Sequence, residues 1–194
     1  LEQQGGIDLL VNNAGVGDGG AFHEYSLENW DWMIGINQMG VLYGCHYFVP
    51  VMQKQKGGQI INIASAAGFA NAPRMSPYNV TKAAVISLSE SLYYELDPLG
   101  IGVSVVMPTF IRTDIMQFAR GTDDAVRRGR KFLEKTKLGP NDAVLEMLTK
   151  AGKGKLHIVL PKEARQSHWM KRIFPRFFRK QLMKISKRQL AKKP

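Results

Sequence analysis

Short apolar runs alternate along the chain with longer segments in which apolar residues recur every three or four positions. The short runs predict strands at residues 7–12, 59–64, 102–107 and 156–160, and the longer segments predict helices at residues 26–52, 76–96 and 141–151. Strands that alternate with helices indicate a parallel sheet with helices packed on it. We therefore predict an α/β fold with a doubly wound parallel sheet over residues 1–160.

Local signals fix several element ends. Ser26 is suited to cap the helix at 26–52, and Ser76 is suited to cap the helix at 76–96, with Pro77 at its first position. Residues 109–138 are too long for a simple connection and predict a functional flap. The run Gly15–Gly20 matches Gly-x-Gly-x-x-Gly in letters, but no helix follows it directly, so we interpret it as a loop.

Composition narrows the class of protein. The 194 residues are 44% hydrophobic, which fits one domain with its own core. Cys45 is the only cysteine, which excludes an internal disulfide framework and a thiolate zinc cluster and predicts a small buried side chain. The four histidines have no metal-ligand spacing, so we predict no metal site.

The net charge of +11 lies entirely in residues 161–194, which we call the basic tail; it contains twelve Lys and Arg residues and one acidic residue. Apolar residues recur there at helical steps, and Pro175 predicts a division into two short amphipathic helices. Three interpretations remain open: binding to an anionic membrane surface, packing against the substrate cleft or a neighbouring subunit, and nucleic-acid binding, which no sequence motif supports.

Tyr78 and Lys82 predict a proton-transfer site. They are four residues apart near the start of a helix, so their side chains share one face. A nearby ammonium favours the phenolate and lowers the pKa of a tyrosine, which then exchanges protons with an alcohol or ketone more readily. Ser65 ends the preceding strand, at the edge where parallel sheets bind ligands, and its hydroxyl can donate to the same oxygen. Each of these residues taken alone also fits a structural role.

Four motifs, in this order and spacing, resemble those of the short-chain dehydrogenase/reductase family: Asn12-Asn13-Ala14-Gly15, Asn37, Ser65 and Tyr78-x-x-x-Lys82. The resemblance covers about residues 1–160 and implies a Rossmann-like fold that binds NAD or NADP. It implies catalytic roles for Asn37, Ser65, Tyr78 and Lys82, in which Asn37 holds a water that links Lys82 to solvent. It also implies a homodimer or homotetramer that pairs through the two long helices.

The resemblance further implies which residues bind the cofactor and the substrate. Residues 108–113 resemble the family's Pro-Gly-x-x-x-Thr loop, with Thr109 where the family usually has glycine. The implied cofactor residues are Asn13, Ala14, Gly15, Tyr78, Lys82, Pro108, Thr109, Ile111 and Thr113. The expected substrate residues are Ser65 and Tyr78, together with Phe110 and Met116 from the apolar residues of the flap. The family's first strands and glycine-rich loop are not in the sequence, so we expect a truncated domain whose preference for NAD or NADP is open.

These observations predict an oxidoreductase that transfers a hydride between NAD(P) and an alcohol or ketone. Apolar residues in the flap favour a lipophilic substrate, although they also fit a lid that simply packs onto the body. The alternatives are a non-catalytic membrane- or protein-interaction module on an incomplete fold, and an epimerase or dehydratase of the extended branch. We expect a cytoplasmic protein, peripheral at a membrane if the tail binds lipid, and no nucleic-acid partner.

Overall fold

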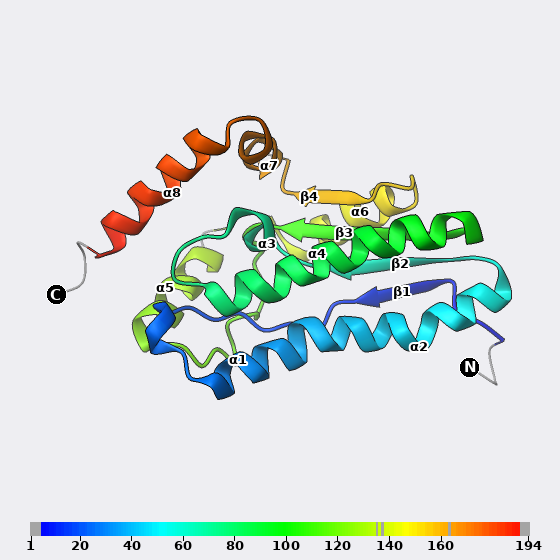
Figure 1. Ribbon diagram of the computed structural model, residues 1–194, viewed down its shortest axis with the longest axis horizontal. Coiled ribbons are helices and arrows are strands. Elements are labelled where there is room, and N and C mark those ends of the chain that lie inside the picture. The colour runs from blue at the N-terminus through cyan, green and yellow to red at the C-terminus, as the bar shows by residue number, and fades with distance from the viewer. Residues whose placement is uncertain (1–4, 135, 137, 163, 191–194) are drawn as a thin grey trace.

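The computed structural model describes residues 5–134, 136, 138–162 and 164–190. Its sheet contains β1 (Leu9–Asn12), β2 (Gly58–Ile63), β3 (Ile101–Pro108) and β4 (His157–Leu160). The strands are parallel and follow the order β1-β2-β3-β4, so their carboxyl ends lie at one edge of the sheet (Figure 1). The predicted strands are confirmed to within two residues at each end.

The first long helical region is interrupted by a change of helix type. It comprises α1 (Leu27–Ile34), a π-helical segment (Gly35–Met39) and α2 (Gly40–Gln55). The Ser26 hydroxyl accepts a hydrogen bond from the Asn29 amide at 3.2 Å, which confirms its predicted capping role. The π-helical segment has no counterpart in the sequence-based prediction.

The second long helix, α4 (Ser76–Leu96), has the predicted span. The prediction that Ser76 caps it is wrong, because Ser76 is the first helical residue and the non-helical backbone of Met75 precedes it. The carbonyl of Met75 already accepts a hydrogen bond from the Asn79 amide at 2.8 Å, and Pro77 falls within the first turn.

The remaining helices include one that the sequence analysis did not predict, α3 (Ala66–Ala70). The flap contains α5 (Asp123–Glu134), and the predicted helix before β4 is α6 (Pro140–Ala151). The basic tail forms the two predicted helices, α7 (Ala164–Ile173) and α8 (Pro175–Leu190). Short 3-10 turns occupy Phe22–Glu24 and Asp97–Leu99.

Alternate residues of the strands supply two hydrophobic cores, because successive side chains point to opposite faces of a sheet. On one face, Ile60 and Val105 pack with α2 and α4 residues such as Val41 and Val85. On the other face, residues that include Ile61 and Val106 pack with Ala143, Met147 and Ala151 of α6. Figure 1 shows α2 and α4 on the near side of the sheet. Helices on both faces confirm the doubly wound architecture.

The face of β1 that points away from α2 has a different environment. Leu10 belongs to the first core, whereas Leu9 and Val11 are exposed. In the described part of the chain, β1 pairs with β2 alone, so one edge and one face of this strand are open.

α3 and α4 approach each other closely at Gly68. A Cβ atom placed on Gly68 would lie 2.6 Å from the backbone carbon of Lys82 and 2.7 Å from its carbonyl oxygen. Both are backbone atoms and cannot rotate away, so only glycine permits this spacing. The contact positions the turn of α4 that contains Lys82 against the helix that follows Ser65.

Gly68→Ala is expected to lower the free energy of unfolding by about 1–3 kcal/mol, because α3 and α4 must move apart to accept the methyl group. Gly35→Ala is the matched control, since a Cβ there meets no atom within 4 Å and the backbone is right-handed helical. Urea unfolding followed by circular dichroism compares the two variants. Equal destabilisation by both would contradict the close-approach argument.

Candidate active site

Tyr78 and Lys82 lie on the first two turns of α4, with their side chains directed into the protein. Only 7% of Tyr78 and 2% of Lys82 is exposed. The Lys82 ammonium donates a hydrogen bond to the carbonyl of Ile63 at 2.9 Å and lies 5.9 Å from the centre of the Tyr78 ring. The spacing of four residues therefore brings the two groups together at the end of β2.

Ser65 joins them from the loop that follows β2. Its backbone is extended, and its hydroxyl caps α3 by accepting a hydrogen bond from the Ala67 amide at 3.1 Å. The same hydroxyl lies 3.3 Å from the carbonyl oxygen of Pro108, to which it can donate, and is hydrogen-bonded to the Tyr78 phenol. The three predicted groups thus meet at the carboxyl ends of β2 and β3.

Burial determines the protonation equilibria of the pair. Desolvation raises the pKa of Tyr78 above its ordinary value of 10, and the hydrogen bond with Ser65 opposes that rise. The direction is opposite to the lowering predicted from the sequence, because desolvation of the phenolate dominates. Desolvation also lowers the pKa of Lys82 from 10.5 to about 8. Tyr78 is therefore a phenol near neutral pH, and the lysine titrates close to that range.

Asn37 lies within the π-helical segment and is fully buried. Its side-chain oxygen accepts from the Val16 amide at 2.8 Å, and its side-chain nitrogen donates to the Val16 carbonyl at 3.0 Å and the Thr81 hydroxyl at 3.3 Å. Asn37 thereby ties the loop after β1 to the α4 turn between Tyr78 and Lys82.

Gly15 lies where this loop passes Asn37 and Lys82. A Cβ atom on Gly15 would be 3.3 Å from the Lys82 nitrogen and 3.4 Å from the Asn37 side-chain oxygen. A side chain would therefore crowd both polar groups. Asn13 and Ala14, the two preceding residues, are exposed at the end of β1.

The segment 108–113 follows the end of β3. The Thr109 amide donates to the Leu160 carbonyl at 2.8 Å, and its hydroxyl donates to the same oxygen at 3.4 Å. Thr109 is not among the described residues with positive φ, so threonine replaces the family's glycine without left-handed backbone strain. Ile111 packs against the second core, and the exposed Thr113 donates to its carbonyl at 3.4 Å.

The two flap residues predicted to contact substrate lie in different environments. Met116 is buried against the loop after β1, where a Cβ on Gly17 would lie 2.9 Å from its sulfur. Phe110 is 48% exposed and stacks on Phe132 with 5.4 Å between ring centres. Met116 thus joins the flap to the loop next to Asn37, whereas Phe110 and Phe132 form an apolar pair on the surface.

Asp18 is a site residue that the sequence analysis missed. It is buried in the loop after β1 and accepts a hydrogen bond from the Gly19 amide at 2.8 Å. Burial raises its pKa, while backbone hydrogen bonds from Gly19, Gly121 and Arg120 and the charge of Arg120 oppose the rise. The carboxylate therefore binds the flap to this loop. An aspartate in a glycine-rich stretch gave no sequence signal for burial.

The flap also contacts α1. The Arg120 guanidinium lies 4.3 Å from the centre of the Trp32 ring, within the range of a cation–π interaction. The Gly17 amide also donates to the Ile115 carbonyl at 3.0 Å. The flap is therefore held over the end of the sheet by contacts at residues 115, 116, 120 and 121.

The histidines lie outside this constellation. His157 of β4 is 2.7 Å from a carboxylate oxygen of Glu90 on α4, and His168 of α7 lies beside it with 6.0 Å between ring centres. Among the residues that the structure describes, no three His, Cys, Asp or Glu side chains form a group that could hold a metal ion. His157 accordingly links β4 to α4.

The buried Lys82 predicts a pH-dependent stability. Because its pKa is about 8 in the folded protein and 10.5 ordinarily, the unfolded chain binds more protons between these values, and the free energy of unfolding rises with pH across this window. Lys82→Met is therefore expected to be more stable than the parent at pH 7 by about 2 kcal/mol, an advantage that shrinks as the pH rises above 8.

Chemical denaturation at a series of pH values measures this difference. The exposed Lys54 supplies the control, since Lys54→Met should leave stability nearly unchanged at every pH. A stability advantage of Lys82→Met that does not vary with pH would show that relief of a buried charge is not its cause.

Known proteins match both the sequence and the fold. A family model for short chain dehydrogenases matches residues 1–124. A probable oxidoreductase, EphD, from Mycobacterium tuberculosis is 34% identical over 189 residues, which are 91% of this chain and 32% of that protein. A CLA biosynthesis dehydrogenase/reductase from Lactiplantibacillus plantarum is 31% identical over 78% of this chain and 59% of its own length. The chain thus spans a third to three fifths of these relatives.

Solved structures agree with these relationships. A short-chain dehydrogenase/reductase from Burkholderia phymatum in complex with NAD has a TM-score of 0.80 and 34% identity, covering 89% of this chain and 69% of its own. A short-chain dehydrogenase from Sphingobium yanoikuyae in complex with NADPH has a TM-score of 0.71 and 28% identity, covering 92% and 65%. The family model covers more than half of the chain. The chain belongs to the short-chain dehydrogenase/reductase family.

Proposed function

We propose that the protein is an NAD(P)-dependent oxidoreductase that interconverts an alcohol and a ketone, with Tyr78 as the proton-transferring residue. The observation that carries this proposal is the convergence of three groups at the carboxyl edge of the sheet. The Tyr78 phenol and the buried Lys82 ammonium of α4 meet there with the Ser65 hydroxyl, which follows β2. Purely structural roles for all three would not require a buried ammonium beside a phenol.

The residues fit the nicotinamide end of a dinucleotide. Lys82 has three N–H donors, and its described hydrogen bond to Ile63 uses one of them, so ribose hydroxyls can take the others. Gly15 keeps the neighbouring space free of a side chain. Pro108, Thr109, Ile111 and Thr113 would line the carboxamide, and Asn13 and Ala14 the adenosine side. When bound, the cofactor supplies or accepts the hydride, and neighbours that bind NAD and NADPH support either form.

Tyr78 and Ser65 act on the substrate oxygen. In the direction of reduction, a carbonyl carbon gains the hydride, the electrons of its π bond move to oxygen, and the Tyr78 phenol supplies the proton that completes the alcohol. The Ser65 hydroxyl donates a hydrogen bond to the same oxygen. The raised pKa of Tyr78 suits it to hold this proton until charge develops on the oxygen.

Lys82 and Asn37 support the return of the proton to Tyr78. Lys82 titrates near neutral pH, since burial lowers its pKa to about 8. Asn37 borders the same space beside Gly15, which supports a water-mediated route from Lys82 toward solvent. The stacked pair of Phe110 and Phe132 at the flap surface supports a lipophilic substrate.

Tyr78→Phe is expected to lower kcat by about 10³-fold, because the ring remains while the transferable proton is lost. Titration with NADH and NADPH should show cofactor affinity within a few-fold of the parent. Turnover is measured with a panel of lipophilic ketones as substrates, from the loss of absorbance as the reduced nicotinamide is oxidised. The exposed Tyr94 provides the control, and Tyr94→Phe should retain full turnover.

Turnover that survives in Tyr78→Phe would refute the assignment of the proton donor. Loss of cofactor binding in the same variant would show that Tyr78 acts by holding the nicotinamide end. Either result can be separated from misfolding by comparing the circular dichroism of the two variants.

We also propose that copies of the protein pair through α2 and α4 as a homodimer or homotetramer. Large apolar side chains are exposed on both helices, and they include Tyr43 and Tyr47 on α2 and Tyr94 on α4. Tyr47→Lys would place a charge at this surface and is expected to shift the mass measured by light scattering to that of a monomer. An unchanged mass would contradict pairing through α2.

A further inference from the structure

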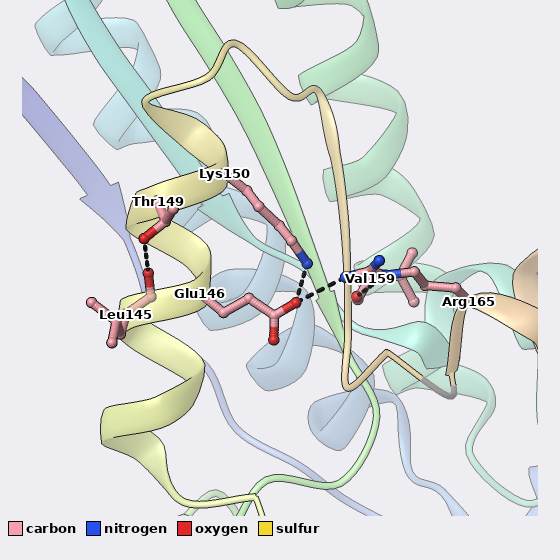
Figure 2. A network of polar contacts seen from close by, with 6 residues as sticks. All are labelled: Leu145, Glu146, Thr149, Lys150, Val159 and Arg165. Carbon is pink, nitrogen blue, oxygen red and sulfur yellow. Dashed lines mark hydrogen bonds and ion pairs between the residues drawn. The ribbon is translucent and has the colours of Figure 1, made fainter.

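The start of the basic tail is fixed to the body of the protein. Figure 2 shows Arg165 of α7 reaching Glu146 of α6, with 2.8 Å between nitrogen and oxygen, while Lys150 pairs with the same carboxylate. Arg165 also donates to the Val159 carbonyl at 3.4 Å. Further along α7, the Lys171 ammonium donates to the Phe69 carbonyl, and His168 packs edge-on against the Phe69 ring.

Beyond this anchor, the tail exposes large apolar side chains. Trp169 and Phe174 are 61% and 62% exposed, and Ile173 and Phe177 are also exposed. These residues surround the bend at Pro175, and we call them the aromatic cluster. Phe178 on α8 is buried, whereas the four residues of the aromatic cluster remain exposed. A soluble surface seldom gathers three large aromatic residues within nine positions without a partner.

The charges around the aromatic cluster have one sign. Residues 164–190 contain nine Lys and Arg residues and no Asp or Glu. Arg172, Arg176, Arg179 and Lys180 are exposed at or next to the cluster. Within the described residues, none of these four takes part in an ion pair. The tail therefore presents positive charge that the described body leaves uncompensated.

We infer that α7 and α8 form a docking site for the surface of an anionic phospholipid bilayer. Aromatic and aliphatic side chains that enter the headgroup boundary, flanked by basic residues that face anionic lipids, are the two contributions that hold interfacial helices at a membrane. A protein partner of ordinary composition would account for the aromatic cluster, but not for the exposed basic residues around it, which have no acidic residue among them. Among the described residues, no helix is long and apolar enough to cross a bilayer, so the site lies on the surface.

The placement of α8 adds a consequence for orientation. Figure 1 shows α8 extending from α7 toward the end of the molecule to which the strand arrowheads point, which is also the end that carries α5 of the flap. A bilayer held by the tail would therefore lie near the edge of the sheet where Ser65 and Tyr78 meet. The docking site is independent of the proposed chemistry, so each can fail without the other.

The test uses sedimentation of the whole protein with vesicles of phosphatidylcholine alone or mixed with phosphatidylglycerol. We expect binding to the mixed vesicles that weakens as salt rises and little binding to phosphatidylcholine alone. Replacing three basic residues, in Arg176→Gln/Arg179→Gln/Lys180→Gln, should weaken binding on the order of 100-fold, at about fivefold for each charge. Trp169→Ser/Phe174→Ser/Phe177→Ser should weaken it by at least a similar factor.

Lys54→Gln/Lys153→Gln/Lys155→Gln is the matched control, because these exposed residues lie near the amino ends of the strands and carry the same charge. It should change binding by less than threefold. Turnover of a water-soluble ketone should be equal in all three variants, which separates docking from catalysis.

Four results would overturn the inference. The first is an absence of binding to mixed vesicles, and the second is equal weakening by the tail and control charge variants. The third is a change of oligomeric state in the aromatic variant, which would assign the cluster to a second copy of the chain. Tighter binding to an oligonucleotide than to mixed vesicles at the same salt would assign the charge to nucleic acid instead and would also count against the inference.

Discussion

The Lys82 ammonium lies in the interior of the protein, and much of the surrounding structure serves to place it there. Desolvation of a charged group is costly unless hydrogen bonds compensate. The described compensation is one backbone carbonyl, that of Ile63, which is available because β2 ends at this residue. The close contact at Gly68 brings α3 against the same turn of α4, and Asn37 connects that turn to the loop after β1. Burial of the Lys82 ammonium therefore lowers the stability of the fold but places an ionisable group beside Tyr78.

Much of the fold follows from sequence patterns, and the errors have identifiable causes. The strands and long helices were predictable because their periods of two and about 3.6 are set by burial on one face. Ser26 was predictable as a cap because a hydroxyl just before a helical run commonly accepts a hydrogen bond from the first turn. The position of Ser76 was not predictable, because Pro77 can occupy the first or the second helical position. The five residues of α3 are too few to show a period.

The site residues could be predicted where residue type and sequence spacing alone indicate their chemistry. A tyrosine and a lysine one helical turn apart, together with a serine at a strand end, identify themselves by residue type and spacing. Asp18 does not, because its burial depends on backbone groups of the flap more than 100 residues away in the sequence. The direction of the Tyr78 pKa was also unpredictable, since the sequence shows the neighbouring charge but not the exclusion of water.

The π-helical segment shapes the site, but the packing of the helix around it does not require it. One wide turn there lets the amide of Gly40 reach the carbonyl of Gly35, five residues back, while Met33 before it and Val41 after it are both buried. Met33 and Val41 are eight residues apart, and both point to the same side because the π-helical turn takes up one extra residue. Seven residues of ordinary α-helix also return nearly to the same side. A single-residue deletion in this stretch would therefore keep both flanking apolar faces aligned. It would nevertheless remove the bulge that turns Asn37 toward Val16 and Thr81. Evolution could therefore lose or gain this polar bridge through one codon without repacking the core.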